Sequence, residues 1–374
     1  MKIGILTLPF NNNYGGYLQA YALMTILKGM GHEVELIYRR HNRRPLSYRI
    51  QYFIKTFIKI ICGMEHGPII ANQEKEYKEQ GELMLPFVEK YISPKTKPLF
   101  STSELKDECT GRYDAIVVGS DQIWRPDYVK DVENYFLDFV ENDSILKISY
   151  AASFGVKRPE FTLSQKQKCG RLIELFDRVS VREDSGLEVL ETFHWKTRCQ
   201  PTVVLDPTML LSKSHYESLI AKQAVKRKYV LSYVLDDNDN VRRITKQICT
   251  IYKMEEKRIF SSRNRRRNNY KMPSIETWLE TLNNAEFLIT DSFHGMVFSI
   301  IFNIPFIVYA NKKRGIDRFE TLLRSLGLMD RLADSPELCN IIARKMIQWD
   351  LVNQKLDKLR ENSSKFLHET CRSQ

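Results

Sequence analysis

The feature that most constrains the fold is a regular alternation of short apolar runs with longer amphipathic segments. A run of four to seven mainly apolar residues fits a buried strand, and the helical pattern that follows it, as in 18–30 before Gly31, fits a crossover helix. This alternation is typical of parallel sheets. The strands predicted for the first half cover 2–8, 34–38, 114–118, 148–152 and 178–182.

The second half repeats this alternation after a Lys- and Arg-rich stretch at 222–228. A length of 374 residues suggests two domains. We therefore predict an α/β fold of two Rossmann-like domains with mainly parallel sheets, residues 1–205 and 206–374, that face each other across a ligand-binding cleft. The elements predicted for the second half are strands at 229–235, 258–260, 287–290 and 306–309 and helices at 275–284 and 295–302.

The chain is basic, with a formal net charge of +11 from 57 basic and 46 acidic residues. Such a charge favours acidic partners, which include phosphorylated small molecules, nucleic acid and anionic lipid. Two dense basic runs, 39–44 and 263–267, are either solvated loops or anion-binding segments. Neither run contains an aromatic residue, which argues against binding of single-stranded nucleic acid. We expect no nucleic-acid partner.

Patterns for metals, cofactors and export are missing from the sequence. The seven cysteines are scattered, histidines do not occur at metal-binding spacings, and there is no glycine-rich phosphate loop. We therefore expect no metal and no cofactor. Met1 to Thr7 resembles a first strand and not a signal peptide, and no apolar run approaches the ~20 residues that span a bilayer. We therefore expect a cytoplasmic protein that is either free or peripheral on the cytoplasmic face of the inner membrane.

The segment 50–61 has the pattern of an amphipathic helix. Its apolar residues recur at the spacing of one helix face, while Lys55 and Lys59 lie on the other face. Such a helix either packs on the N-terminal core or lies on an anionic membrane surface, and the sequence leaves both readings open. The apolar positions are Ile50, Phe53, Ile54, Phe57, Ile58 and Ile61.

Six short motifs follow one another along nearly the whole chain. They are NYGGYLQAYAL at 13–23, DAIVVGSDQIW at 114–124, SYAASFG at 149–155, VSVRE at 179–183, LDPT at 205–208 and TDSFHG at 290–295. In this order they resemble the polysaccharide pyruvyl transferase family. The resemblance implies two Rossmann-like domains arranged as in GT-B glycosyltransferases, with phosphoenolpyruvate as the donor substrate.

The resemblance also implies the reaction. A pyruvyl group would pass to hydroxyls of a sugar, as a 4,6-ketal, in a bacterial capsule or exopolysaccharide precursor that is a free glycan or a lipid-linked oligosaccharide. Two alternatives stay open: a GT-B glycosyltransferase that uses a nucleotide sugar, and a non-catalytic scaffold of a glycan-assembly complex.

A donor with a carboxylate and a phosphate calls for arginine, whose planar fork binds both groups. Arg182 follows a predicted strand and matches a donor-binding position of the family, although it could instead pair with a neighbouring glutamate. The family often has Arg-Leu-His where this chain has Ser292-Phe293-His294, so Lys313, Arg314 or Arg318 would have to supply the missing charge. The start of the helix, with Ser292, Phe293 and Gly295 and a cap at Asp291 or Ser292, offers backbone N–H groups to an anion.

His294 is the predicted catalytic acid, which would protonate C3 of the enol. Asp121, at the end of the strand that begins near 114, is either a base for the acceptor hydroxyls or a helix cap. Tyr14 or Trp124 would stack on a sugar or lie buried, and the LDPT segment is interpreted as a structural turn. The residues expected to bind the acceptor are Asn13, Tyr14, Gly15, Gln19, Ser120, Gln122 and Trp124.

Overall fold

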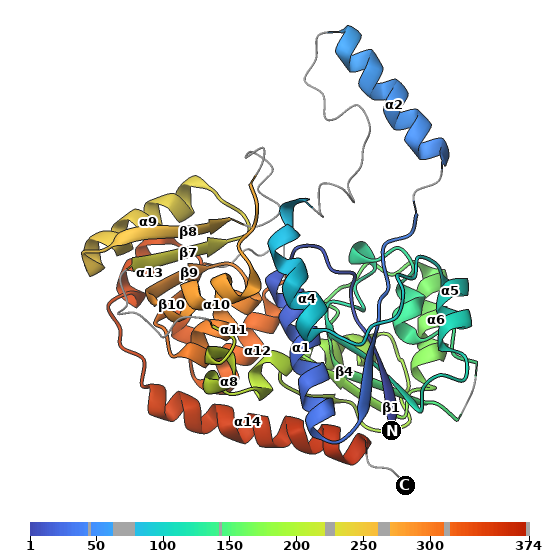
Figure 1. The fold of residues 1–374 in the computed structure, drawn as a ribbon. Helices are drawn as coiled ribbons and strands as arrows, with labels where there is room; N and C mark the ends of the chain where they lie inside the picture. The colour runs from blue at the N-terminus through green and yellow to red at the C-terminus, as the bar shows by residue number, and fades with distance from the viewer. Residues whose placement is uncertain are drawn as a thin grey trace.

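The computed structural model describes residues 1–43, 46–62, 79–141, 144–220, 229–260, 270–309 and 315–371. These residues form two sheets in which every paired strand is parallel to its neighbour (Figure 1). The first sheet has the strand order β2-β1-β3-β4-β5-β6. Its strands are β1 (Lys2–Leu6), β2 (Glu33–Ile37), β3 (Ala115–Asp121), β4 (Leu146–Ala152), β5 (Arg178–Val181) and β6 (Thr202–Val203).

The second sheet has the order β11-β10-β9-β7-β8. All strands predicted from the sequence are present, and the predicted α/β fold with two parallel sheets is confirmed. The sequence patterns had not indicated the two-residue edge strands β6 and β11. The strands of this sheet are β7 (Tyr229–Val234), β8 (Glu255–Phe260), β9 (Ala285–Thr290), β10 (Phe306–Tyr309) and β11 (Leu332–Ala333).

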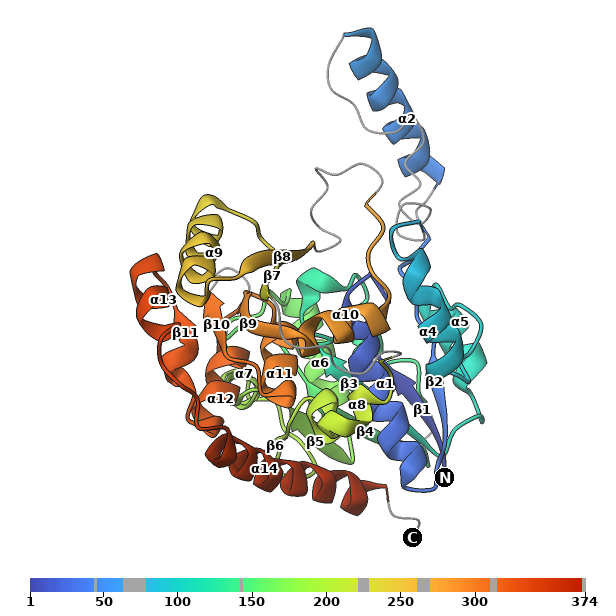
Figure 2. The ribbon, with the colours of Figure 1, turned by 60° about the vertical axis from the view of Figure 1, so that its left-hand side comes forward.

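Helices connect the strands and cover the sheets (Figures 1 and 2). In the first half they are α1 (Tyr14–Gly29), α2 (Leu46–Ile61), η1 (Glu82–Met84), α4 (Leu85–Tyr91), α5 (Thr102–Cys109), η2 (Pro126–Tyr128), η3 (Val132–Phe136), α6 (Leu163–Ile173) and α7 (Asp184–Thr192). In the second half they are η4 (Pro207–Leu210), α8 (Lys213–Glu217), α9 (Asp239–Tyr252), α10 (Ile275–Asn283), α11 (Phe293–Phe302), α12 (Asp317–Leu326), η6 (Met329–Arg331), α13 (Pro336–Ile342) and α14 (Trp349–Thr370).

Helix α1 begins four residues earlier than the apolar pattern predicted. The side chain of Asn13 caps the helix by accepting a hydrogen bond from the backbone N–H of Gly15, which converts the predicted loop into a first helical turn. The helix ends as predicted: Met30 is its C-cap, and Gly31 has a φ of +88°, a backbone conformation that glycine adopts without strain. The first turn of α1 is therefore fixed directly after β1.

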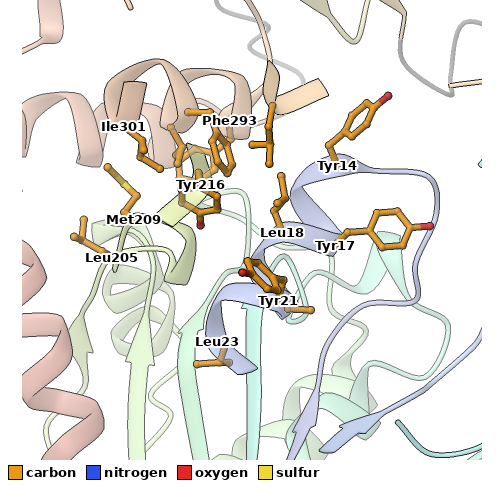
Figure 3. Packing of buried hydrophobic residues seen from close by; sticks show 14 of the residues in the cluster. Tyr14, Tyr17, Leu18, Tyr21, Leu23, Leu205, Met209, Tyr216, Phe293 and Ile301 are labelled. Carbon is orange, nitrogen blue, oxygen red and sulfur yellow. The ribbon is translucent and has the colours of Figure 1, made fainter. Parts of the chain in front are cut away.

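The two halves share one hydrophobic core. A single cluster of buried side chains contains residues from both sheets, such as Ile5 of β1 and Leu288 of β9. Figure 3 shows α1 side chains facing those of η4, α8 and α11. The ring of Tyr14 stacks on Trp278 of α10 with centroids 4.9 Å apart, and its hydroxyl donates to the carbonyl of Pro273. The relative position of the sheets is thus set by packed apolar contacts.

Helix α14 returns from the second half to the first and runs beneath both (Figures 1 and 2). Phe366 of α14 contacts the ring of Tyr150 on β4, and Ser363 accepts a hydrogen bond from the backbone N–H of Leu205. The last strand of the first sheet ends at Val203 and the first strand of the second sheet begins at Tyr229, and this interval contains the predicted boundary after residue 205. The C-terminal helix therefore ties the halves together.

Helix α2 stands away from the rest of the molecule (Figures 1 and 2). It covers the predicted amphipathic segment, and its apolar side chains are exposed, so of the two readings that the sequence left open the structure does not support packing on the N-terminal core. Within the described residues, no helix has the length and apolar character needed to cross a membrane.

Candidate functional site

A buried ion network lies where the carboxyl ends of β3 and β5 meet the second half of the chain. At its centre is Arg182, the first residue after β5, whose side chain is 2% exposed. Its Nη1 donates to Asp206 Oδ2 over 2.9 Å, and its Nη2 lies 3.5 Å from Asp121 Oδ1. Its Nε lies 3.8 Å from Glu183 Oε2. Three carboxylates thus surround one guanidinium group.

Asp206 joins the network to the second half. Its Oδ1 accepts hydrogen bonds from the backbone N–H and the hydroxyl of Thr208, and its Oδ2 accepts one from Ser120 Oγ. Burial alone would raise the pKa of Asp206, but the imidazole of His294 and the guanidinium of Arg182 hold that pKa well below its usual range. Asp206 is therefore a buried carboxylate that stays ionised.

His294 reaches this carboxylate from the first turn of α11. Its Nε2 lies 3.5 Å from Asp206 Oδ2, and the side chain is 8% exposed. The imidazole ring lies directly against Gly15, where a Cβ atom would overlap the ring. The first turn of α1 and the first turn of α11 therefore meet at His294, so that the imidazole is held between the two halves of the chain.

Two guanidinium groups flank Phe293. The carbon at the centre of the Arg182 guanidinium lies 4.6 Å from the centroid of the Phe293 ring, and that of Arg318, on α12, lies 5.7 Å from it. Burial and the positive charge of Arg182 lower the pKa of Arg318 to about 10. Arg318 is therefore brought to the segment that lacks the expected arginine, whereas Lys313 and Arg314 lie outside the described residues.

Several buried donors in this cluster have no hydrogen-bond acceptor among the described residues. They are Nε of Arg318 together with Nε and Nη2 of Arg182 and Nε2 of His294, and the last three lie 3.5–3.8 Å from carboxylate oxygens without a hydrogen bond to them. Leaving a buried donor unsatisfied costs about 1–3 kcal/mol, and more when the group is charged. Because all four belong to groups that can carry positive charge, an anion with several oxygens is the ligand that would satisfy them.

A pocket opens beside this cluster. Arg182 and Asp206 lie at one end of it beside the ring of Phe293, and α12 and α14 form walls through Leu322 and Leu359. The pocket thus has a charged end and an apolar wall, while His294 and Arg318 lie outside its lining. Among the described residues, no group of three or more His, Cys, Asp or Glu side chains is arranged to hold a metal ion.

The residues expected to hold the anion occupy the start of α11. Ser292 is the N-cap, as one of the two predicted positions, and its hydroxyl accepts from the backbone N–H of Gly295. Asp291 instead accepts hydrogen bonds from the backbone N–H groups of Leu235 and Asp236, which fixes the end of β7 against this turn. Ser292 and Gly295 therefore shape the turn that carries Phe293 and His294.

Several residues expected to bind the acceptor have structural roles instead. Gln19 is buried, and its side chain bonds to Thr7 and to the backbone of Gly16 and Ser120. Ser120 itself is fully buried and bonds to Ala151 and Asp206. These hydrogen bonds consume the polar groups that a sugar would need, so the prediction for Gln19 and Ser120 is wrong.

The two aromatic residues expected to stack on a sugar are also buried. Trp124 is fully buried, its indole N–H donates to the carbonyl of Tyr135, and its ring stacks on Phe136. Tyr14 is fully buried against Trp278. Neither ring has a face for a ligand, which corrects the sugar-stacking prediction for both residues.

The remaining predicted residues lie around the network. Asp121 is 8% exposed, has a φ of +76°, and accepts a hydrogen bond from the backbone N–H of Gln122. The side chain of Gln122 accepts one from Arg125. Asn13 is exposed at the start of α1. Asp121 is the member of this group that reaches Arg182.

Sequence reasoning missed two acidic residues of the network. Asp206 was interpreted as part of a turn, and Glu183 was treated only as a partner for Arg182. Glu183 is fully buried, and burial raises its pKa although Arg182 and Ser153 oppose this rise. Both residues lie inside motifs at 179–183 and 205–208, so the signal was present in the sequence.

Comparison with known proteins gives a family and a fold. The family model for polysaccharide pyruvyl transferase matches residues 13–313. The UDP-GlcNAc 2-epimerase of Methanocaldococcus jannaschii is similar in structure, with a TM-score of 0.52, 12% identity and 93% coverage of each chain. The UDP-N-acetylglucosamine 2-epimerase of Rickettsia bellii has a TM-score of 0.53, 7% identity and 99% coverage of each chain.

At these identities the structural likeness shows the fold alone, which is GT-B-like. The comparison with curated proteins returns no match. The family model spans the segments that supply Asp121, Arg182, Glu183, Asp206 and His294, whereas Arg318 lies beyond the matched residues. With most of its length matched, the chain belongs to the polysaccharide pyruvyl transferase family.

Proposed function

We propose that the protein transfers a pyruvyl group from phosphoenolpyruvate to two hydroxyls of a sugar in a bacterial surface polysaccharide precursor, as a ketal at the 4 and 6 positions. Family membership supports pyruvyl transfer. The observation that carries the donor assignment is the set of buried, unsatisfied donors on Arg182, Arg318 and His294. A phosphate and a carboxylate together supply enough acceptor oxygens for all of them.

The two arginines hold the donor in this proposal. Arg182 is already paired with Asp206, but its Nε and Nη2 remain available, and Arg318 approaches the same ring of Phe293. The positive charges of the two arginines repel each other, and this repulsion is relieved when an anion binds between them.

His294 acts as the general acid. Protonation of C3 of the enol leaves a cationic C2, which a sugar hydroxyl attacks. The bond between C2 and the phosphate oxygen then breaks, and phosphate departs with the proton of the first hydroxyl. The second hydroxyl closes the ketal and gives its proton to the base, and the imidazole regains a proton from solvent. Asp206 holds the imidazole and balances the charge of its protonated form.

Asp121 is the proposed base for the acceptor. It lies at the end of β3, and only its Oδ1 is engaged by Gln122 and approached by Arg182. We place the reaction in the cytoplasm, where phosphoenolpyruvate is produced, with no cofactor and no nucleic-acid partner. The acceptor is a glycan or a lipid-linked oligosaccharide.

The test is an assay with purified protein, phosphoenolpyruvate and a panel of galactosides, mannosides, glucosides and N-acetylhexosaminides. Phosphate release that requires both the donor and one acceptor is expected. Release of a nucleoside diphosphate from a nucleotide sugar would instead establish a glycosyltransferase. Calorimetry with phosphoenolpyruvate alone, and with UDP-GlcNAc alone, separates the two donors when no acceptor in the panel reacts.

Substitution of the catalytic acid tests its role. His294→Gln should lower the rate of phosphate release by about 10²–10⁴-fold, because general acid catalysis contributes a factor of that size. The control is His368→Gln on the exposed surface of α14, which should leave the rate unchanged. Unchanged glycan assembly in cells that carry His294→Gln would favour a scaffold role.

A further inference from the structure

The geometry points to a second functional surface on this protein: α2 is a docking helix for an anionic lipid surface. The inference does not depend on the reaction catalysed, since α2 stands apart from the ion network (Figures 1 and 2). It rests on two properties of the helix: an exposed apolar face and an excess of positive charge.

The apolar face of α2 has no partner within the described residues. Six large apolar side chains at the spacing of one helix face are each about half exposed or more, whereas such side chains are usually buried. They are Ile50 at 52%, Phe53 at 47%, Ile54 at 50%, Phe57 at 52%, Ile58 at 53% and Ile61 at 70% exposure.

The less exposed side of the helix is a different one. Thr56 is 4% exposed and Tyr52 is half-buried, and both positions lie off the apolar face by the 100° rotation per residue of an α-helix. The large apolar side chains therefore share a face that is exposed along its whole length.

The charge around the helix selects the surface that it fits. From residue 39 to residue 62 the sequence contains seven arginines and lysines and no acidic residue. Lys55 and Lys59 are exposed on α2, and Arg43 is exposed just before it. Arg39 is the exception, because it is buried in an ion pair with Asp131. Long basic side chains can reach lipid headgroups while the apolar face enters the acyl region.

The length of α2 fits a helix that lies flat in the interface. Sixteen residues span about 24 Å at 1.5 Å per residue, which is shorter than a bilayer core of roughly 30 Å. A second copy of the chain is a poorer occupant, since it would bring two basic helices together. An anionic lipid surface instead supplies both an apolar phase and negative charge.

The experiment uses the full-length protein and flotation with two kinds of vesicle, phosphatidylcholine alone and phosphatidylcholine mixed with phosphatidylglycerol. Binding to the anionic vesicles is expected, with weaker binding to the neutral ones. The double variant Phe53→Glu and Phe57→Glu should weaken this binding about tenfold or more, because it places charge where the helix would enter the acyl region.

A matched control separates docking from general surface effects. Leu163 and Leu351 are exposed on α6 and α14, at 74% and 52%, so the double variant Leu163→Glu and Leu351→Glu adds the same charge elsewhere and should bind vesicles normally. The double variant Lys55→Gln and Lys59→Gln should weaken binding to anionic vesicles by about fivefold for each lysine removed.

Two results of the flotation experiment would contradict the inference. One is wild-type protein that does not bind anionic vesicles, and the other is equal binding by the wild type and the Phe53 and Phe57 double variant. Sedimentation velocity that shows a dimer lost in that variant would assign the face to a second copy. Circular dichroism and a melting curve for each variant establish that the fold is intact.

Discussion

Replacement of Asp206 by asparagine is the sharpest test of the buried network. Asparagine keeps the size of the side chain and can still accept from Thr208, but its amide would face Nη1 of Arg182, the hydroxyl of Ser120 and the ring of His294. The NH2 group of asparagine then faces other hydrogen-bond donors, and Arg182 loses the carboxylate that lies 2.9 Å from its Nη1. The variant should remain foldable but be much less stable.

The magnitude follows from the burial of both partners, at 2% and 0% exposure for Arg182 and Asp206. Removing one member of such a buried pair costs about 3–5 kcal/mol, because the other charge is left in a medium of low dielectric constant. With a urea dependence of ~3 kcal/mol per molar, the unfolding midpoint should fall by about 1–1.7 M. The fully buried Trp124 and Trp278 report the transition by fluorescence.

The control is Asp107→Asn on the exposed face of α5, which should change the free energy of unfolding by less than about 0.5 kcal/mol. The double variant Arg182→Met and Asp206→Asn should be less destabilised than the sum of its single changes. If Asp206→Asn lowers the free energy of unfolding by no more than Asp107→Asn does, the buried network does not stabilise the fold as a unit.

Acid titration gives an independent check on the same residue. The folded-state pKa of Asp206 is held below its usual range, so its contribution to stability is present above about pH 4 and is lost as the pH falls further. The stability difference between the wild type and Asp206→Asn should therefore narrow below about pH 4. A difference that stays constant down to low pH would contradict the lowered pKa.

Two further predictions concern the groups around His294. Gly15→Ala places a Cβ atom in the imidazole ring, so it should cost about 1–3 kcal/mol and most of the activity, as measured by urea unfolding and phosphate release. Gly16→Ala is the control, because its Cβ atom would meet only ordinary van der Waals contacts, and it should leave the free energy of unfolding unchanged or slightly raised. If both variants lose the same stability and activity, contact with His294 is not the cause. Arg318→Gln should raise the KM for phosphoenolpyruvate about tenfold with a smaller change in kcat, since it removes one charge from the anion site; an unchanged KM would remove Arg318 from donor binding.

The sequence allowed the positions of Arg182 and His294 to be predicted because both follow strands in parallel sheets. The carboxyl ends of such strands lie at one edge, so residues just beyond them are brought together wherever two sheets face each other. The structure shows this: Arg182 after β5 and His294 after β9 are both in contact with Asp206. Strand order did not have to be known for this inference.

The roles of Asp206, Gln19 and Trp124 could not be predicted in the same way. Asp206 has the local pattern of a turn, and its importance comes from contacts with Ser120, Arg182 and His294 that are distant in sequence. Gln19 and Trp124 lie in motifs beside the site, but their side chains point into the core. A motif locates a region of the fold, whereas the direction of a side chain depends on packing.

Helix α2 shows a different limit. Its amphipathic pattern predicts the helix and its apolar face correctly, since the pattern depends only on the 3.6-residue period. This periodicity does not determine which surface the apolar face contacts. Only the exposure of Phe53 and Phe57 in the fold separates a helix packed on the core from one that is open to a surface.

The reaction itself is tested most directly by carrying it out in D₂O and examining the sugar product by proton NMR. Protonation of C3 by the imidazole of His294, which exchanges with solvent, predicts a ketal methyl group that carries one deuterium, together with release of inorganic phosphate. A sugar product without a pyruvyl methyl group, or a methyl group without deuterium, would contradict the proposed transfer.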